Sequence, residues 1–488
     1  MRIGIDISTV LNHGKDVGAG RYILNLVKNL FEIDSGDEFI LTGRYITDEY
    51  LWLAEELRQH YIRVNKGASK SSTSCSSLIA DNNHAKKSLK EIDEMSRHAI
   101  IKAGEKGDKV RNGEVCRSGA ADAAVETDKP DRYPTDLEGR RTANWTGHNK
   151  SGKLSFRLIK STQKKLDLSN RAGFPPMEFY GFKADVFHCP DFLIPPTLNN
   201  KIILTIHDLA FIRFPQFNFD WFVKKYTNLV RRNANTAAGI IADSQSTKND
   251  IVEFFAVKED KITVVHLAGD EVFRKLNAGE IDHSVAAKYK VTKKFILSTG
   301  TIEPRKNYVT LIKAFNRLKS ENRAKIGSGI DNSGGPSSTV STGDLQLVIV
   351  GRTGWMSEPA IAEYNNSPFK DDIILAGRLS DAELLQMYNM AELFVYPSVF
   401  EGFGLPVVEA MQCGLPVIAS NSSSIPELVD DKRLLFDPID EGGILDKIKF
   451  VLDDDTLKAK LSEESLKNAA KFSWKNTAQK TLEVYRKI

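Results

Sequence analysis

The sequence predicts an α/β protein with two doubly wound domains, each built on a parallel sheet. Strand-like and helix-like segments alternate along most of the chain, a pattern typical of parallel sheets covered by helices. The strand-like segments form two series, separated by a polar stretch at residues 268–292. A chain of 488 residues is also long enough for two or three domains, each with its own core. We therefore expect two Rossmann-like domains that face each other across a cleft.

The expected strands are short, mostly apolar runs. We place the N-terminal domain at residues 1–280, the C-terminal domain at 281–473, and a final helix at 474–488. In the first series the strands lie at 3–7, 38–41, 184–188, 201–206, 239–242 and 262–265, and in the second at 295–298, 345–350, 372–375, 393–396 and 416–419.

Two segments interrupt this alternation. Residues 67–152 are rich in Ser, Lys, Asp, Asn and Gly and contain few aromatic residues. Such a composition buries too little apolar surface to offset the entropy of ordering, so we expect a disordered insertion with a short helix at 87–103. Residues 322–343 are rich in Gly and Ser and predict a flexible loop.

The composition excludes several classes of protein. Hydrophobic residues make up 41% and charged residues 27%, as in soluble globular proteins, and the net charge of +3 is too small to favour nucleic acid as a partner. No apolar run approaches the roughly 20 residues that span a bilayer, and no signal peptide precedes the first strand. We expect a cytoplasmic protein with reduced thiols, because its cysteines are scattered without metal-binding spacing: Cys75, Cys116, Cys189 and Cys413.

Two glutamates in the second half are the most informative feature. Glu401 follows the apolar run 393–396, and Glu409 lies about one turn into the helix that comes next. The carboxyl end of a parallel strand is where ligands bind in open α/β sheets. Gly402 and Gly404 lie between the two acids and let backbone N–H groups approach an anionic group at a helix N-terminus. Two carboxylates beside such a loop suit the vicinal hydroxyls of a sugar.

A second motif carries positive charge. Arg305 and Lys306 follow the strand 295–298 and a loop of small residues that contains Gly300, and they precede an amphipathic helix. Backbone amides and two cations in this position would stabilise a diphosphate. The alternative is a solvated Arg-Lys pair beside a loop.

Three further loops follow expected strands. Gly18 and Gly20 open a helix near the N-terminus, either as a phosphate-facing loop or as a helix start that requires glycine. His207 follows the strand 201–206, where a lone histidine is either structural or functional, and Asp208 beside it would orient the loop. The third loop follows the strand 372–375 and comprises residues 377–379.

The seven-residue spacing between Glu401 and Glu409 resembles the E-x7-E motif of retaining glycosyltransferases of the GT-B fold, most closely the GT4 family. The other motifs follow in the order of that family, although Thr301 stands where an arginine is usual. The resemblance implies that Glu409 binds the ribose of a nucleotide-sugar donor and that Arg305 and Lys306 bind its diphosphate. It implies donor binding by the glycine loop and the third loop as well, and a final helix that packs back on the N-terminal domain. The implied catalytic residues are His207, Glu401, Arg305 and Lys306, and the implied donor-binding residues are Gly18, Gly20, Gly300, Gly377, Arg378, Leu379, Phe403, Gly404, Leu405 and Glu409.

The resemblance also implies chemistry without a cofactor or metal ion. The donor's own phosphate would deprotonate the acceptor, and the protein would supply position and charge. Asp453-Asp-Asp455 matches a metal-binding pattern formally, but its place at a helix boundary favours helix capping.

We therefore expect a retaining hexosyltransferase of cell-surface polysaccharide assembly that uses GDP-mannose and a glycan or lipid-linked acceptor. The alternatives are a glucosyl- or GlcNAc-transferase using a UDP-sugar, a GT-B epimerase or phosphorylase, and a non-catalytic sugar-nucleotide-binding protein. Residues 219–232 predict a basic amphipathic helix. This helix either contacts the inner membrane face or packs on its own sheet.

Overall fold

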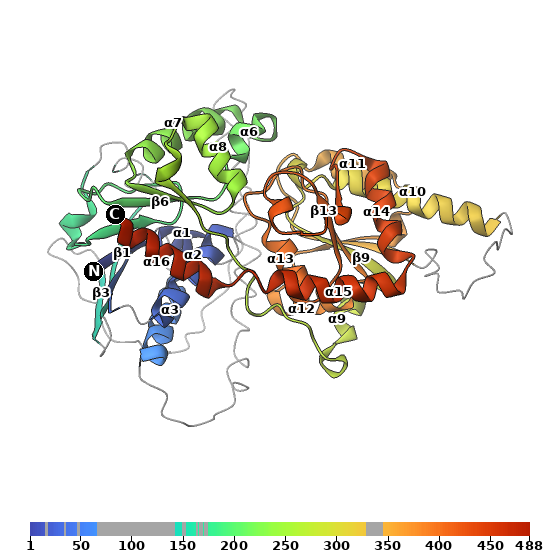
Figure 1. The fold of residues 1–488 in the computed structure, drawn as a ribbon, viewed down its shortest axis with the longest axis horizontal. Coiled ribbons are helices and arrows are strands. Elements are labelled where there is room, and N and C mark those ends of the chain that lie inside the picture. The colour runs from blue at the N-terminus through green and yellow to red at the C-terminus, as the bar shows by residue number, and fades with distance from the viewer. Residues whose placement is uncertain are drawn as a thin grey trace, which may run out of the picture. The chain divides into compact units, whose positions relative to one another are not determined.

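The computed structural model describes residues 1–14, 18–33, 36–45, 49–65, 142–148, 153–162, 164, 169, 174–327 and 345–488. Most of the expected insertion, including the helix expected at 87–103, lies outside the described residues. The described residues all belong to one compact unit. This unit contains two sheets, and Figure 1 shows each of them with helices around it.

The N-terminal sheet has the strand order β3-β4-β2-β1-β5-β6-β7-β8. Every neighbouring pair is parallel except β3 and β4. Its strands are β1 (Arg2–Asp6), β2 (Glu38–Tyr45), β3 (Thr142–His148), β4 (Lys153–Lys160), β5 (Val186–Cys189), β6 (Ile202–Ile206), β7 (Gly239–Ala242) and β8 (Ile262–Val264). The helices are α1 (Ser8–His13), α2 (Gly18–Glu32), α3 (Leu51–Asn65), α6 (Ala210–Arg213), α7 (Asp220–Thr236) and α8 (Gln245–Phe255).

The edge of this sheet corrects the sequence-based prediction. Residues 142–148, which we expected to belong to a disordered insertion, form β3 and pair antiparallel with β4. No strand was predicted at β4, which pairs in parallel with β2 along its whole length. The physical reason is visible in β4, where Leu154, Phe156 and Leu158 alternate along the strand and are buried. β4 pairs with β2 on one side, and on its other side it pairs with residues 142–148, whose polar sequence suggested disorder.

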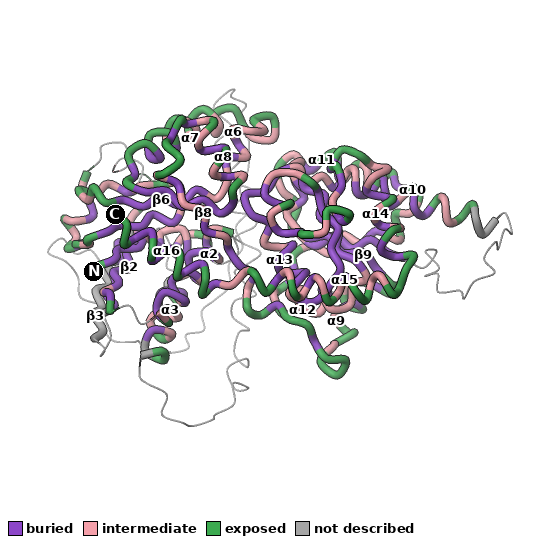
Figure 2. Tube along the Cα trace, in the orientation of Figure 1, coloured by how far each residue is buried: buried purple, intermediate pink, exposed green. Residues whose placement is uncertain are grey.

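The C-terminal sheet has the order β11-β10-β9-β12-β13-β14, and all its neighbouring pairs are parallel. Buried residues follow its strands, as Figure 2 shows around β9. The strands are β9 (Lys294–Thr299), β10 (Leu345–Val350), β11 (Ile373–Gly377), β12 (Leu393–Tyr396), β13 (Val417–Ser420) and β14 (Leu435–Phe436). The helices are α9 (His283–Lys288), α10 (Tyr308–Gly327), α11 (Glu358–Asn366), α12 (Asp381–Met390), α13 (Leu405–Gln412), α14 (Glu441–Leu452) and α15 (Asp455–Ala469).

Two details of this domain bear on the sequence-based predictions. Helix α10 extends to Gly327, so the first residues of the loop expected at 322–343 are helical, and residues 328–344 lie outside the described residues. Asp454 is the N-cap of α15, where its side chain accepts a hydrogen bond from the Leu457 backbone N–H. Helix capping was the role expected for the acidic triplet at 453–455, and it is confirmed for Asp454.

The last helix, α16 (Trp474–Lys487), packs against α2 of the N-terminal half. The Tyr485 hydroxyl forms a hydrogen bond with Nδ1 of His188, a buried residue of β5, at 2.7 Å. Near the other end of the helix, Trp474 Nε1 donates to the Gly269 carbonyl at 3.0 Å. None of the described helices is long and apolar enough to span a bilayer.

Candidate active site

The strand order of the C-terminal sheet predicts where a ligand binds. The chain runs outward from β9 to β10 and β11, then returns to the other side of β9 to form β12. Ligands of doubly wound sheets bind at this switch point, outside the carboxyl ends of the two neighbouring strands. The loops that leave β9 and β12 there carry Arg305 with Lys306 and Glu401, respectively.

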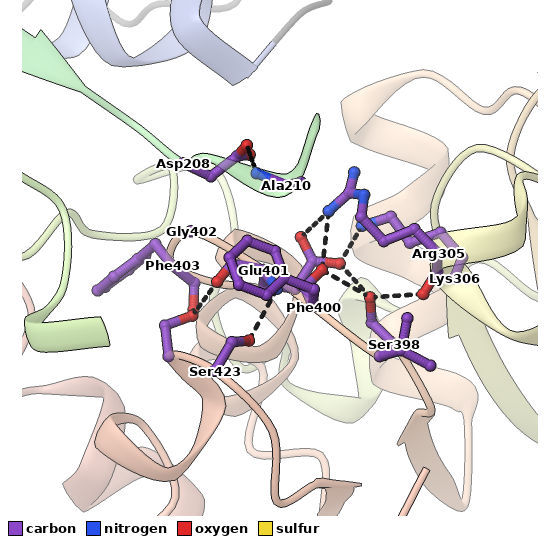
Figure 3. Close-up of polar contacts among 12 residues, drawn as sticks. Asp208, Ala210, Arg305, Lys306, Ser398, Phe400, Glu401, Gly402, Phe403 and Ser423 are labelled. Atoms are coloured by element: carbon purple, nitrogen blue, oxygen red, sulfur yellow. Dashed lines mark hydrogen bonds and ion pairs between the residues drawn. The ribbon is translucent and has the colours of Figure 1, made fainter. Parts of the chain in front are cut away.

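Glu401 is the centre of a buried ion cluster (Figure 3). Its Oε1 accepts hydrogen bonds from Lys306 Nζ and from the Ser398 hydroxyl, both at 2.5 Å. Its Oε2 accepts from the Arg305 guanidinium at 2.7 Å. Burial alone would raise the pKa of Glu401, but the two cations more than offset it and hold the pKa at about 2. The carboxylate is therefore ionised at neutral pH and fixes both cations at the switch point.

Glu409 lies in the first turns of α13 and is also buried. Its carboxylate accepts a hydrogen bond from Arg21 of α2 at 2.9 Å and one from the Tyr388 hydroxyl at 3.3 Å. Arg21 also donates to Asp381, which follows the loop after β11. Burial raises the pKa of Glu409 to about 7, although Arg21 opposes this shift. This carboxylate is the less firmly ionised of the two acids in the motif.

His207 follows β6 in the N-terminal sheet. Its Nδ1 lies 2.7 Å from Oδ2 of Asp243, its Nε2 lies 3.1 Å from the Pro190 carbonyl oxygen, and its ring meets the edge of Tyr22. Burial alone would lower the pKa of His207, but the Asp243 carboxylate more than offsets it and raises the pKa to about 9. The imidazole is thus positively charged at neutral pH. Asp208 accepts a hydrogen bond from the Ala210 backbone N–H, so it orients the loop, as the sequence predicted.

Close backbone contacts join these loops. A Cβ at Gly402 would lie 2.0 Å from the carbonyl oxygen of His207, so only glycine allows the loop after β12 to approach the loop after β6. A Cβ at Gly351, which follows β10, would lie 1.8 Å from the carbonyl oxygen of Gly300. These two close contacts between loops are therefore possible only because Gly402 and Gly351 have no side chain.

The remaining predicted site residues lie in four segments of the chain. Gly18 and Gly20 lie in the first turn of α2, directly before Arg21. Gly300 follows β9, Gly377 is the last residue of β11, and Arg378 and Leu379 lie between β11 and α12. The Phe403 ring packs against His266 and Phe472 instead of lying open. Gly404 is the N-cap of α13 and Leu405 is the first residue of this helix.

Three charged residues that were not predicted as site residues form ion pairs with the predicted ones. Glu303 binds Arg305, Arg21 binds Glu409, and Asp243 binds His207. For two of these residues, Arg21 and Asp243, the sequence contains a feature that could have indicated a role. Arg21 places a cation in the first turn of a helix, where the helix dipole disfavours it. Asp243 directly follows β7, at the same edge of the sheet as His207.

These groups can perform two tasks together. Arg305 and Lys306 can bind an anionic group at the switch point, and a carboxylate such as Glu409 can accept hydrogen bonds from a cis-diol. Such a pairing of an anion site with a diol site fits a nucleotide sugar. With two Rossmann-like domains, it defines a glycosyltransferase of the GT-B fold.

Comparisons with known proteins identify the family. Residues 282–470 match the model of the glycosyl transferases group 1, and residues 156–270 match that of glycosyltransferase family 4. The chain therefore belongs to the GT4-like glycosyltransferases and is a hexosyltransferase. The predictions of family and fold class are confirmed.

Two curated relatives come from Escherichia coli. The O-antigen chain mannosyltransferase B is 29% identical over 306 residues, which cover 62% of this chain and 75% of the relative. The serotype-specific mannosyltransferase WbdA is 30% identical over 297 residues, which cover 59% of this chain but only 34% of WbdA. Among solved structures, Alr3699/HepE of Anabaena in complex with UDP and glucose has a TM-score of 0.59 at 14% identity, with full coverage of both chains, and supports the fold.

Proposed function

We propose that this protein is a retaining mannosyltransferase that moves mannose from GDP-mannose to a glycan or lipid-linked acceptor. The observation that carries the proposal is the pair of fixed cations, Arg305 and Lys306, at the switch point of a GT-B fold. The names of the two E. coli relatives support mannose as the sugar and surface polysaccharide as the product class.

In this proposal the C-terminal domain, residues 281–473, binds the donor, and the N-terminal domain, residues 1–280, binds the acceptor. Glu409 accepts hydrogen bonds from the ribose hydroxyls, and the loop of residues 377–379 faces the base. Glu401 and the backbone at 403–405 hold the sugar hydroxyls, with the glycines at 18, 20 and 300 near the phosphates. His207 contacts the sugar near the reacting carbon.

The chemistry follows from charge and position. Arg305 and Lys306 stabilise the negative charge that develops on the leaving diphosphate. The same phosphate deprotonates the attacking hydroxyl on the face from which it departs, which retains the anomeric configuration. The two cations supply the positive charge that this step needs, so we propose that the reaction is metal-independent.

We also propose that the acceptor lies at the inner membrane face and that α7 contacts this surface. Trp221 and Phe219, at the start of α7, are 60% and 47% exposed. The cations Lys224, Lys225 and Arg232 on the same helix are exposed as well. Exposed aromatic and basic side chains on one helix suit the headgroup region of an anionic membrane.

A thermal-shift screen tests the donor site. Purified protein is heated with GDP, UDP, ADP and their common sugar conjugates. A ligand present at a hundred times its dissociation constant adds about 2.7 kcal/mol to the free energy of unfolding and raises the melting temperature. We expect GDP-mannose to do so, Glu409→Ala to abolish the shift, and the exposed control Glu463→Ala to retain it.

The other outcomes are equally informative. A shift by a UDP-sugar alone would replace mannose transfer with glucosyl or GlcNAc transfer. Turnover of the nucleotide sugar without an acceptor would favour an epimerase. No shift with any nucleotide would contradict the proposed donor site.

A further inference from the structure

In the free protein, two carboxylates accept hydrogen bonds from different edges of the Arg305 guanidinium. Its Nε and one terminal nitrogen donate to the same oxygen of Glu303, at 3.1 and 2.8 Å. Its other terminal nitrogen donates to Glu401 at 2.7 Å and to the Phe400 carbonyl at 3.0 Å. These contacts use four of the five N–H groups of a guanidinium. The orientation of Arg305 is therefore fixed by two carboxylates, of which only Glu401 belongs to the predicted motif.

The charges of the cluster cancel. Arg305 and Lys306 contribute two positive charges, and Glu303 and Glu401 contribute two negative charges when both are ionised. The side chains of both acids are almost wholly buried, with 3% and 9% of their surface exposed. A bound diphosphate would add two negative charges to a site that has no net positive charge to receive them. Because the site is buried, this imbalance is poorly screened by water.

A proton can correct the imbalance, and Glu303 is the acid better placed to take it. Glu401 faces both cations and a hydroxyl donor, which favour its ionised form. Glu303 has a single cationic partner within hydrogen-bonding distance, Arg305, among the contacts of the described residues. The other titratable groups that act on Glu303 or face it are Lys306, Glu401 and Tyr308.

We propose that Glu303 is the charge-compensating group of the diphosphate site: it positions Arg305 in the free protein and takes up a proton from solvent when the donor's diphosphate binds. The proposal rests on the proposed function, since it requires a diphosphate at Arg305 and Lys306. Burial raises the pKa of Glu303 above its ordinary value even before binding, although Arg305 and Lys306 oppose the shift, and this supports the assignment. The added negative charge of the donor raises it further.

The proposal fixes the direction of a pH effect. A group that gains a proton on binding makes the ligand bind more tightly as the pH falls, by up to about tenfold per pH unit for one proton. Glu303→Gln keeps an oxygen that accepts from Arg305 but cannot titrate. This variant should bind the donor at neutral pH as tightly as the wild type or several-fold more tightly, without this pH dependence.

The test is titration calorimetry with GDP-mannose, whose phosphates carry no proton that titrates near neutral pH. Binding is measured in buffers of different ionisation enthalpy, which gives the number of protons taken up. The difference between wild type and Glu303→Gln isolates this residue from Glu409, whose pKa is raised to about 7 by burial. Glu463→Gln, an exposed acid, is the matched control. We expect Glu303→Gln to lower the proton uptake and the control to leave it unchanged.

A second measurement can overturn the inference even if the variant is unstable. Infrared difference spectra of the wild type with and without GDP-mannose should show a new band of a protonated carboxyl group. Its absence, or equal proton uptake in wild type and Glu303→Gln, would overturn the inference while leaving the donor site intact. No binding of GDP-mannose or of any other nucleotide sugar would instead overturn the proposed function, and this inference with it.

In turnover, Glu303→Ala should lower kcat at least tenfold because Arg305 loses the partner on one edge, and Glu303→Gln should restore most of this loss. A residue with a purely structural role would show no such rescue together with a changed pH profile.

Discussion

At the scale of single residues, each predicted site group depends on a partner far away in the sequence. Glu401 and Lys306 are 95 positions apart, and Arg21 and Glu409 are 388 positions apart. Motif spacing could locate Glu401, Glu409 and the two cations, because spacing is local information. It could not locate Arg21, since its partner is set by how the chain folds. The sequence therefore singles out the groups that we propose face the ligand, but not the groups that hold them.

The pair of His207 and Asp243 gives a prediction at this scale. The pKa of His207 is raised from 6.5 to about 9, so its ion pair stabilises the fold fully below pH 6.5 and ceases to do so as the pH rises through about 9. Asp243→Asn should lower the free energy of unfolding by about 2 kcal/mol at the lower pH, in the range of a charged hydrogen bond. Denaturant unfolding at both ends of this range measures the difference.

The difference between wild type and Asp243→Asn should shrink as the pH rises. Asp371→Asn, an exposed acid, should show no such change. A difference that is constant with pH would mean that His207 is neutral in the wild type.

At the scale of elements, most of the described strands were predictable and three were not. The eleven predicted runs are mostly apolar, which is the signal of a strand buried on both faces. Strands β3 and β4 were missed because neither is a continuous apolar run: the edge strand β3 is mostly polar, and β4 includes Lys153, Arg157 and Lys160. Strand β14 has only two residues, too few for any periodicity.

The final helix provides the prediction at this scale. Tyr485→Phe removes the hydroxyl that bonds to Nδ1 of His188 and leaves a buried nitrogen without this partner. An unsatisfied buried polar atom costs about 1–3 kcal/mol, so the urea midpoint of the variant should fall measurably. Glu483→Ala, at an exposed position of the same helix, should change stability by less than about 0.5 kcal/mol. Equal midpoints for Tyr485→Phe and the wild type would show that α16 is not anchored through this contact.

At the scale of the whole molecule, one carboxylate links the two Rossmann-like halves. Glu427 follows β13 and accepts hydrogen bonds from the backbone N–H groups of Gln245 and Ser246 at 2.9 and 3.0 Å. These are the first two amides of α8, where the helix dipole favours a negative charge. His266 Nε2 lies 3.0 Å from the same carboxylate. No motif indicated Glu427, because its partners are two backbone amides and a histidine of the other half.

Glu427→Ala should weaken the association of the two halves. Charge-assisted hydrogen bonds of this kind contribute about 1.5–3 kcal/mol, and 2 kcal/mol corresponds to roughly a thirtyfold change in an equilibrium. The KM for the donor should therefore rise by up to about thirtyfold while kcat changes little, and small-angle scattering should show a larger radius of gyration without donor. An unchanged KM would mean that the association of the two halves does not depend on this contact.

The two glycines at the switch point have a consequence for how mutational tolerance is interpreted. Any substitution at Gly402 or Gly351 would drive a side chain into a backbone carbonyl and displace a loop. A saturation screen for activity would score both positions as harshly as Glu409, although their intolerance comes from the lack of space for a side chain and not from a side chain that binds the donor. If positions were ranked only by how poorly they tolerate substitution, these glycines would be counted among the catalytic residues. They are intolerant because a side chain does not fit there.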